Sequence, residues 1–181
     1  MLPTPRRIHI IGTTCTGKTT LARRIAEHLD IPHVELDAIH WGPGWALPEK
    51  GVFRTKAAQV LGGDTWVVDG NYSEVRDIVW ARVEMVIWLD YPFLLVFWRL
   101  LWRTMRRVLM REELWHGNRE SIYGAFFAKD SLLRYVIRTY RRRRMQYAAL
   151  MAAPDYSHIN FVRLRSPREE EKLINELADL Q

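Results

Sequence analysis

Short apolar runs alternate with longer amphipathic segments along this chain. Leu21, Ile25 and Leu29 recur every four residues, the spacing of one helix face. The apolar runs predict five strands, over residues 6–12, 33–37, 65–70, 84–90 and 159–164. Regular alternation of strand and helix is typical of an α/β domain with a parallel sheet.

Helices are predicted between these strands, and some begin or end at capping residues or prolines. The segments with helical periodicity are 17–29, a stretch from Pro48 to about 61, 73–80, 92–110, 130–151 and a last helix from 166. In the fourth, Leu94, Phe97, Leu101 and Val108 are predicted to oppose Arg99, Arg103, Arg106 and Arg107. Ser166 and Glu169 form a capping box around Pro167. Residues 38–48 and 111–129 are predicted to be irregular.

Composition places the chain among ordinary globular proteins. It has 181 residues, 48% hydrophobic and 27% charged, which fits a single domain over 1–181. Its one cysteine, Cys15, excludes an internal disulfide and a Cys/His metal cluster and fits a reducing, cytoplasmic location. The most apolar stretch, 85–102, contains Asp90 and Arg99, so we expect no membrane span and no membrane partner.

Positive charge is concentrated in one part of the chain. Residues 99–144 carry thirteen Lys or Arg and four Asp or Glu, a net charge of +9, whereas the rest sums to −3. Nearly all are arginines, which bind phosphate and carboxylate bidentately and indicate an anionic partner. The alternative is a solvated helix face. In the run 141–144, a helix would let one or two of the arginines face inward. The sequence contains no recognised DNA-binding motif, so nucleic acid is a possible but less favoured partner.

The strongest motif joins the first strand to the first helix. Residues 12–19 fit the pattern G-x-x-x-x-G-K-[ST] in full, which predicts a phosphate-binding loop. We expect Lys18 to reach the β- and γ-phosphates of ATP and the Thr19 hydroxyl to bind Mg²⁺. The residues assigned to the nucleotide here are Gly12, Thr13, Thr14, Cys15, Thr16, Gly17, Lys18, Thr19 and Thr20.

Three predicted strands end in aspartate, at the sheet edge where ligands bind in open α/β folds. Asp69, in the apolar run before Gly70, suits a magnesium carboxylate, with a turn residue as the alternative. Asp37 is predicted to orient or deprotonate the acceptor hydroxyl, with a helix cap as the alternative. For Asp90 we favour capping of the next helix over metal binding.

Arginines after the fourth strand are candidates for a lid over residues 103–144 that stabilises the transferred phosphoryl group. Arg107 and Arg119 are assigned to catalysis, and Arg119 also to the nucleotide. Trp41 and Trp45 suggest a planar or apolar acceptor, with packing over the sheet as the alternative. His40 and His116 are expected near the site in structural roles.

Several segments together resemble the bacterial DNA topology modulation proteins, P-loop proteins similar to adenylate kinase. They are the phosphate loop, Leu36-Asp37 followed by Trp41 and Trp45, Asp69-Gly70-Asn71-Tyr72, residues 86–90 and residues 164–169. Arg165, in the last of these segments, is assigned to nucleotide binding. The resemblance implies a three-layer P-loop NTPase fold with sheet order 2-3-1-4-5, an acceptor region after the second strand and a lid after the fourth. Asp37 resembles the acceptor-hydroxyl aspartate of shikimate- and gluconate-type kinases.

The sequence therefore predicts an ATP- and Mg²⁺-dependent phosphotransferase of the nucleotide-kinase type, acting on a small-molecule phosphate acceptor. Two alternatives remain open at this stage. One is an ATP-binding regulatory or DNA-associated protein that uses its arginine-rich helices. The other is a kinase for an antibiotic or another foreign compound. The sequence permits a monomer or a homodimer.

Overall fold

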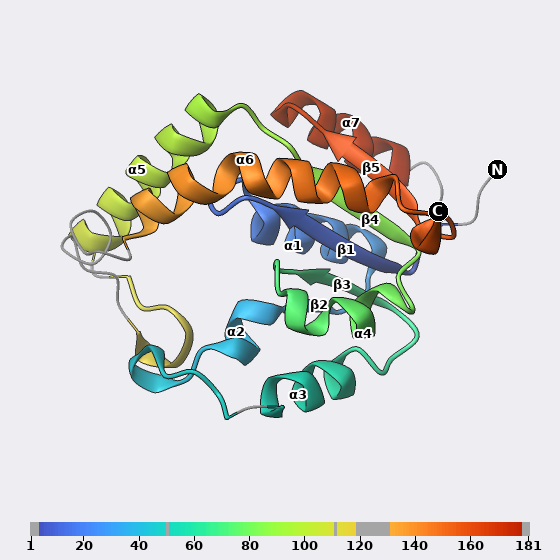
Figure 1. The fold of residues 1–181 in the computed structure, drawn as a ribbon, viewed down its shortest axis with the longest axis horizontal. Helices are drawn as coiled ribbons and strands as arrows, with labels where there is room; N and C mark the ends of the chain where they lie inside the picture. The colour runs from blue at the N-terminus through green and yellow to red at the C-terminus, as the bar shows by residue number, and fades with distance from the viewer. Residues whose placement is uncertain (1–3, 50, 111, 119–130, 179–181) are drawn as a thin grey trace.

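A five-stranded parallel sheet forms the centre of the computed structural model, which describes residues 4–49, 51–110, 112–118 and 131–178 (Figure 1). The strands run in the order β2-β3-β1-β4-β5, and every neighbouring pair is parallel. The predicted α/β class and order 2-3-1-4-5 are confirmed. The strand bounds are β1 Arg7–Gly12, β2 His33–Glu35, β3 Trp66–Asp69, β4 Met85–Leu89 and β5 Asn160–Leu164.

Helices connect the strands in the order that the sequence predicted. The α-helices are α1 Lys18–Leu29, α2 Leu36–His40, α3 Val52–Val60, α4 Arg76–Trp80, α5 Phe93–Leu109, α6 Leu132–Met151 and α7 Pro167–Ala178. Short 3-10 turns add η1 Pro43–Trp45, η2 Ser73–Val75, η3 Trp115–Gly117 and η5 Pro154–Tyr156. At the start of α7, Ser166 accepts from the Glu169 amide, which confirms the Ser166 half of the predicted capping box, while Glu169 accepts from the Arg165 amide, one residue before the cap.

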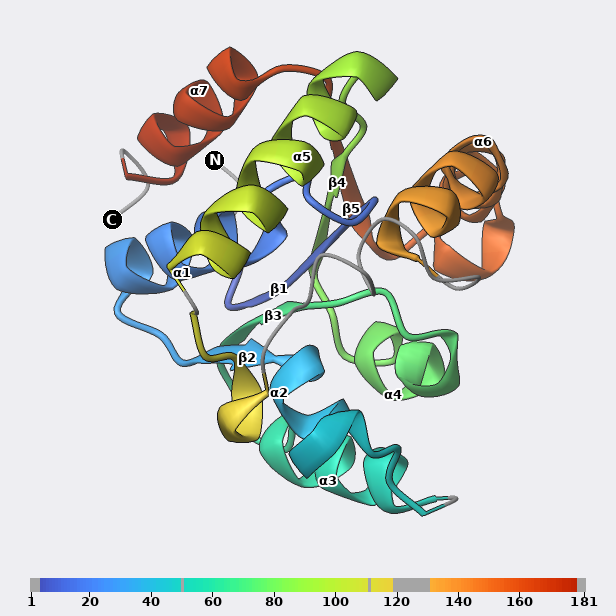
Figure 2. The same cartoon turned by 90° about the vertical axis from the view of Figure 1, so that its left-hand side faces the viewer.

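The strands are apolar on both faces because helices cover both (Figure 2). Ile8, Ile10 and Ile87 face the layer formed by α1, α5 and α7, where they join one buried cluster. Alternate residues such as Val68 and Trp88 face α3, α4 and the C-terminal half of α6. This gives the three layers of a P-loop NTPase fold and brings the carboxyl ends of β1, β2 and β3 to one edge.

Two local expectations are wrong. The second strand ends at Glu35, and Asp37 lies in the first turn of α2. The cause is the burial of Leu36 against Gly70. Gly70 has a φ of +139°, and a Cβ atom on it would lie 2.8 Å from the Cβ of Leu36, so only glycine allows this contact. In α5 the buried residues are Val96, Leu100 and Thr104, so the predicted apolar face is not the core face.

Candidate active site

The phosphate loop is held by bonds to its own backbone. The carbonyl oxygen of Thr13 accepts from the Thr16 amide at 3.2 Å, the Thr16 hydroxyl at 2.8 Å and Lys18 Nζ at 3.2 Å. Gly12 adopts φ +155°, and a Cβ there would lie 2.9 Å from the Leu89 carbonyl oxygen. The motif's first glycine is therefore required by the packing of the loop against β4.

Two residues that sequence analysis missed tie this loop to the rest of the protein. Asn71 accepts from the Gly12 amide at 3.1 Å and donates back to the Gly12 carbonyl. Arg99 of α5 donates to the Thr16 carbonyl oxygen at 2.6 Å. Because no described side chain caps α1, its N-terminal amides keep their capacity to bind an anion.

The metal side of the predicted site is assembled across α1, β3 and β2. Asp69 Oδ2 accepts from the Thr19 hydroxyl at 2.6 Å, and Asp69 Oδ1 lies 3.1 Å from Nε2 of His33. Asp69 is buried. The sequence predicted the Thr19–Asp69 pair, but His33 carries no motif that would have identified it.

Oxygen donors of this kind suit Mg²⁺, which binds through one or two protein oxygens together with substrate phosphates. Thr19 and Asp69 supply a hydroxyl and a carboxylate that already meet. The described residues contain no cluster of three or more His, Cys, Asp or Glu side chains that could hold a metal alone. This donor set therefore fits a magnesium ion that is shared with a nucleotide.

Lys18 lies among charged groups at the centre of the site. Burial lowers the pKa of its ammonium group, while the negative charges of Asp37 and Asp69 raise it. Arg143, on α6, lowers the pKa of Lys18 further. The pKa of Lys18 thus responds to both the predicted metal carboxylate and the predicted acceptor carboxylate.

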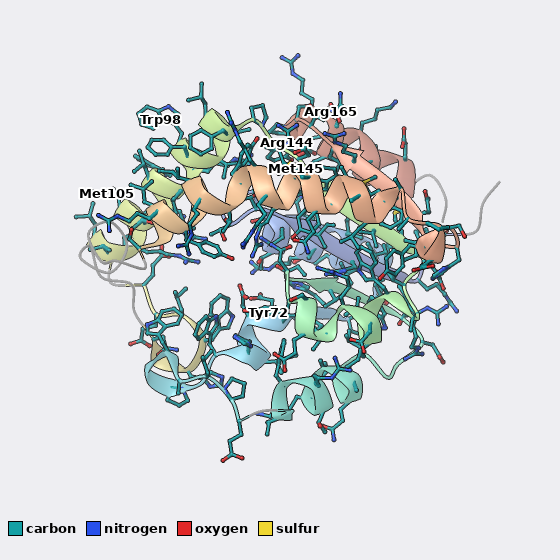
Figure 3. The ribbon with its side chains drawn as sticks, viewed as in Figure 1. Tyr72, Trp98, Met105, Arg144, Met145 and Arg165 are labelled. Carbon is teal, nitrogen blue, oxygen red and sulfur yellow. The ribbon has the colours of Figure 1, made fainter. Side chains whose placement is uncertain are left out.

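Aromatic side chains pack beside Asp37, on the predicted acceptor side of the site. The Tyr72 hydroxyl donates to Asp37 Oδ1, and burial, followed by the charge of Asp37, raises the pKa of Tyr72. Figure 3 shows Tyr72 on the side of the central opening that faces α6. The His40 ring packs 4.3 Å from that of Tyr72 and 4.8 Å from that of Phe53, centroid to centroid, so His40 has the expected structural role.

Residues 112–118, which we call the strap, lie over the loop of residues 38–48, which we call the acceptor loop because the sequence predicts acceptor binding there. The buried side chain of Asn118 accepts from the Trp45 amide and donates to the Gly42 carbonyl oxygen, both at 3.0 Å. Trp115 Nε1 donates to Glu35 at 3.1 Å, and His116 Nε2 lies 3.3 Å from the carbonyl oxygen of Ala38. Residues 112–118 of the predicted lid are therefore docked on the loop of residues 38–48, the predicted acceptor region.

A pocket of about 590 Å³ opens between this loop and α3. Among the described residues, its lining contains none from the phosphate loop and begins at Ala38, the residue after Asp37. Its size falls within the range of small-molecule sites. The lining is largely apolar, with His40, Trp41, Leu47, Val52, Val60 and His116 among its members.

The predicted arginines are only partly brought together. Arg107 is largely buried on α5 with its Nε 3.9 Å from Glu112, whereas Arg119 lies outside the described residues. Arg165 is exposed, and Figure 3 shows it well away from Tyr72. In the run 141–144, Arg144 reaches inward to Asp90, in line with the prediction that one or two would, whereas Arg143 donates to Tyr135 on its own helix.

Asp90 is neither a cap nor a metal ligand candidate. The helix that follows has Pro92 at its N-cap position and receives no side-chain capping bond. Instead Asp90 Oδ1 lies 2.7 Å from Arg144 Nε, and Asp90 Oδ2 accepts from Arg163 at 2.5 Å. Two guanidinium groups neutralise this buried carboxylate, which therefore joins β4, β5 and α6.

The comparisons with known proteins show the fold. The sequence matches no protein-family model and no curated protein sequence. The structure is similar to a shikimate kinase from Acinetobacter baumannii in complex with shikimate, with a TM-score of 0.60, 16% identity and coverage of 98% of this chain and 93% of that one. It is also similar to a shikimate kinase from Bacteroides thetaiotaomicron, with TM-score 0.59, 17% identity and coverage of 97% and 98%. A gluconokinase from Sinorhizobium meliloti gives TM-score 0.55 and 16% identity over 99% and 93%.

Proposed function

We propose that this protein is an ATP-dependent phosphotransferase that phosphorylates a hydroxyl group of a small molecule. The observation that carries the proposal is the 2.6 Å bond from Thr19, the residue after Lys18 in the phosphate loop, to Asp69, while the charges of Asp69 and Asp37 both act on the pKa of Lys18. A kinase needs a cation at the transferred phosphoryl group, a carboxylate for the metal and a base for the acceptor. Within the P-loop kinase fold, Lys18, Asp69 and Asp37 meet that requirement.

On the donor side, the loop amides and Lys18 would bind the β- and γ-phosphates. Thr19 and Asp69 would hold Mg²⁺, which neutralises charge on those phosphates when bound. His33 keeps Asp69 oriented through Oδ1. Arg143, whose charge lowers the pKa of Lys18, would stabilise the transferred group in the role that the sequence assigned to Arg107 and Arg119.

On the acceptor side, the Tyr72 bond fixes the Asp37 carboxylate so that its second oxygen can receive the acceptor's hydroxyl proton. The acceptor oxygen forms a bond to the γ-phosphorus while the bond from that phosphorus to the β,γ-bridging oxygen breaks. The products are ADP and a phosphate monoester, and the released proton passes from Asp37 to water.

Hydroxy acids and polyols are the first acceptors to test. The similar structures include kinases named for gluconate and shikimate, which both carry several hydroxyl groups and a carboxylate. The aromatic side chains of Trp41, which lines the pocket, and Tyr72, which bonds Asp37, also support nucleosides and foreign ring compounds as candidates. Membership of the topology modulation family, a cytoplasmic location and a lid over 103–144 remain part of this proposal. Among the described helices, none has the length and apolar character needed to cross a membrane.

The test is an acceptor screen that measures ADP release above the rate without acceptor. It should contain hydroxy acids, polyols, nucleosides, nucleotides and aminoglycosides, each with ATP and Mg²⁺. One class should raise ADP release at least about tenfold and yield a phosphorylated product by mass spectrometry. The Lys18→Ala variant should lose both ATP binding and turnover.

Asp37→Asn is the matched control on the acceptor side. It should lose acceptor-stimulated turnover by about 100-fold or more while its Kd for ATP stays within about twofold of the wild type. Loss of ATP affinity in Asp37→Asn would contradict the acceptor assignment. Failure of wild-type protein to bind ATP at all would overturn the proposed function.

A further inference from the structure

A row of large apolar side chains lies exposed along the outer side of α5. Trp98 is 67% exposed and Trp102 is 76% exposed, and Figure 3 shows Trp98 and Met105 pointing away from the sheet and from Tyr72. We call this row the α5 stripe. It consists of Leu94, Trp98, Trp102, Met105 and Leu109.

The stripe is separate from the candidate active site. The face of α5 that carries Val96 and Leu100 is buried against the core, and Arg99 reaches the phosphate loop from a third side. The other sides of α5 therefore have partners in the core and the phosphate loop, whereas the side chains of the stripe are largely exposed. Monomeric proteins rarely expose so large a continuous apolar patch.

Its spacing is that of a helix-pairing surface. From Trp98 onward the stripe residues follow at intervals of four, three and four, the repeat with which two helices pack side by side. Together the five side chains expose on the order of 700 Å², close to what each partner contributes to a standard protein–protein interface. A second helix with the same stripe would cover this area fully.

Charge distinguishes a protein partner from an anionic lipid surface. A membrane-surface helix carries Lys and Arg beside its apolar face, where they reach headgroups. Here Arg99 is directed to Thr16, and Arg106 and Arg107 both lie beside Glu112, at 3.0 and 3.9 Å. Arg99, Arg106 and Arg107 are therefore engaged by groups of this chain, whereas a membrane-surface helix leaves such side chains free to reach headgroups.

We infer that the α5 stripe is a homodimer interface in which α5 of one protomer packs antiparallel against α5 of its partner. The helix contains no acidic residue, and Arg106 and Arg107 lie in its last turn. A parallel pair would bring these basic ends together. An antiparallel pair separates them and places each beside the partner's uncharged first turn, with the helix dipoles opposed. Trp102 then lies near the two-fold axis.

The first test is the oligomeric state of the full chain, measured by sedimentation equilibrium between about 1 and 100 µM, where mass action resolves a dimer. The wild type should be dimeric at the upper concentrations. Trp98→Glu and Trp102→Glu should raise the dimer Kd at least about 100-fold, as for a central interface tryptophan. Both sites are exposed, so the variants should keep the wild-type circular dichroism, and their melting temperature should match that of the wild type at concentrations where the wild type is monomeric.

Met145→Glu is the matched control, since Met145 is 68% exposed but lies on α6. It should leave the dimer unchanged. A wild type that is monomeric throughout, or a dimer that Trp102→Glu does not weaken, would overturn the inference. Flotation with vesicles that contain anionic lipid is a further arm: stripe-dependent vesicle binding by a monomer would assign the surface to a membrane instead.

A cross-linking test fixes the orientation. In a Cys15→Ser background, protein with Leu94→Cys mixed with protein with Leu109→Cys should give a heterodimer with a short bis-maleimide reagent. Leu94→Cys alone should give several-fold less cross-linked product. The reverse pattern would contradict the antiparallel pair.

Discussion

The hydroxyl of Thr19 donates a 2.6 Å hydrogen bond to Oδ2 of Asp69, across fifty residues of sequence. This bond joins the first turn of α1 to the end of β3 and brings two hard oxygen ligands together. Oδ1 of the same carboxylate is 3.1 Å from His33, so both oxygens of Asp69 are held in place. The magnesium site proposed at these two oxygens can be tested by removing either side chain.

Asp69→Asn and Thr19→Val should weaken binding of ATP in the presence of Mg²⁺ by about 10- to 100-fold, because each removes one metal ligand. Binding of ATP in excess EDTA should change far less, since the loop and Lys18 remain. Isothermal titration calorimetry with and without Mg²⁺ measures the difference. Equal losses in both conditions would mean that Thr19 and Asp69 only shape the loop.

Tyr72→Phe should lower kcat/KM for the acceptor by about tenfold, the effect of losing one hydrogen bond to a charged group. Its hydroxyl donates to Asp37, so the carboxylate loses its fixed orientation while the aromatic packing beside it keeps its shape. The KM for ATP should stay unchanged. Steady-state kinetics with each substrate varied in turn checks the expectation, and an effect confined to ATP would contradict it.

The phosphate loop could be predicted from the sequence because its signal is local, whereas the sheet order came only from the family resemblance. A strand, a glycine-rich loop and a helix are contiguous between Arg7 and Leu29. The partners of the site could not be found in this way. Asn71 clamps Gly12 from 59 residues away, and Arg144 reaches Asp90 across 54. Such pairs exist only once the sheet has formed, and no spacing rule connects them.

The missed turn after β2 has a different cause. Leu36 and Asp37 continue the polar and apolar alternation of a strand, so the pattern alone extends β2. Packing of Leu36 under Gly70 turns the chain into α2 instead. The orientation of α5 likewise depends on tertiary contacts. Arg99 bonds the Thr16 carbonyl oxygen, and with the helix in this orientation Val96 and Leu100 are the buried apolar residues.

Asn118→Ala should loosen the strap from the acceptor loop. The substitution leaves the Trp45 amide and the Gly42 carbonyl oxygen without their partner, at a cost of about 1–3 kcal/mol. Hydrogen exchange in a peptide that covers residues 42–46 should accelerate, while exchange in β1 stays unchanged. Acceptor KM should rise more than ATP KM. Unchanged exchange at Trp45 would show that the strap does not hold the loop.

Asp90→Asn should lower the free energy of unfolding by about 3 kcal/mol, because it leaves two guanidinium groups without their buried counter-charge. The Asp90 side chain is 1% exposed. Asp77→Asn is the control: Asp77 pairs with Arg54 at 2.7 Å on the surface and should contribute less than about 1 kcal/mol. Urea denaturation compares the two, and the Kd for ATP should be unaffected by either.

His9 should make the fold sensitive to mild acid. Its Nδ1 accepts from Trp80 Nε1 at 2.9 Å, so Nε2 carries the proton and donates to the Gly70 carbonyl oxygen at 2.9 Å. Burial lowers the pKa of His9 to about 4. The bond to Gly70 and the charge of Asp69 raise this pKa, and the charges of Arg76 and Lys18 lower it. The folded state therefore holds a neutral imidazole.

The unfolded chain takes up a proton at this histidine below its ordinary pKa of 6.5, whereas the folded protein does so only near pH 4. Stability from His9 is therefore complete above pH 6.5 and is lost as the pH falls toward 4, by about 3 kcal/mol over the window. Urea denaturation at several pH values measures the slope. His9→Gln, which keeps a donor and an acceptor, should flatten it, and substitution of the exposed His28 by Gln should not. If wild type and His9→Gln lose stability in parallel from pH 6.5 to 4, the buried imidazole is not the acid-sensitive group.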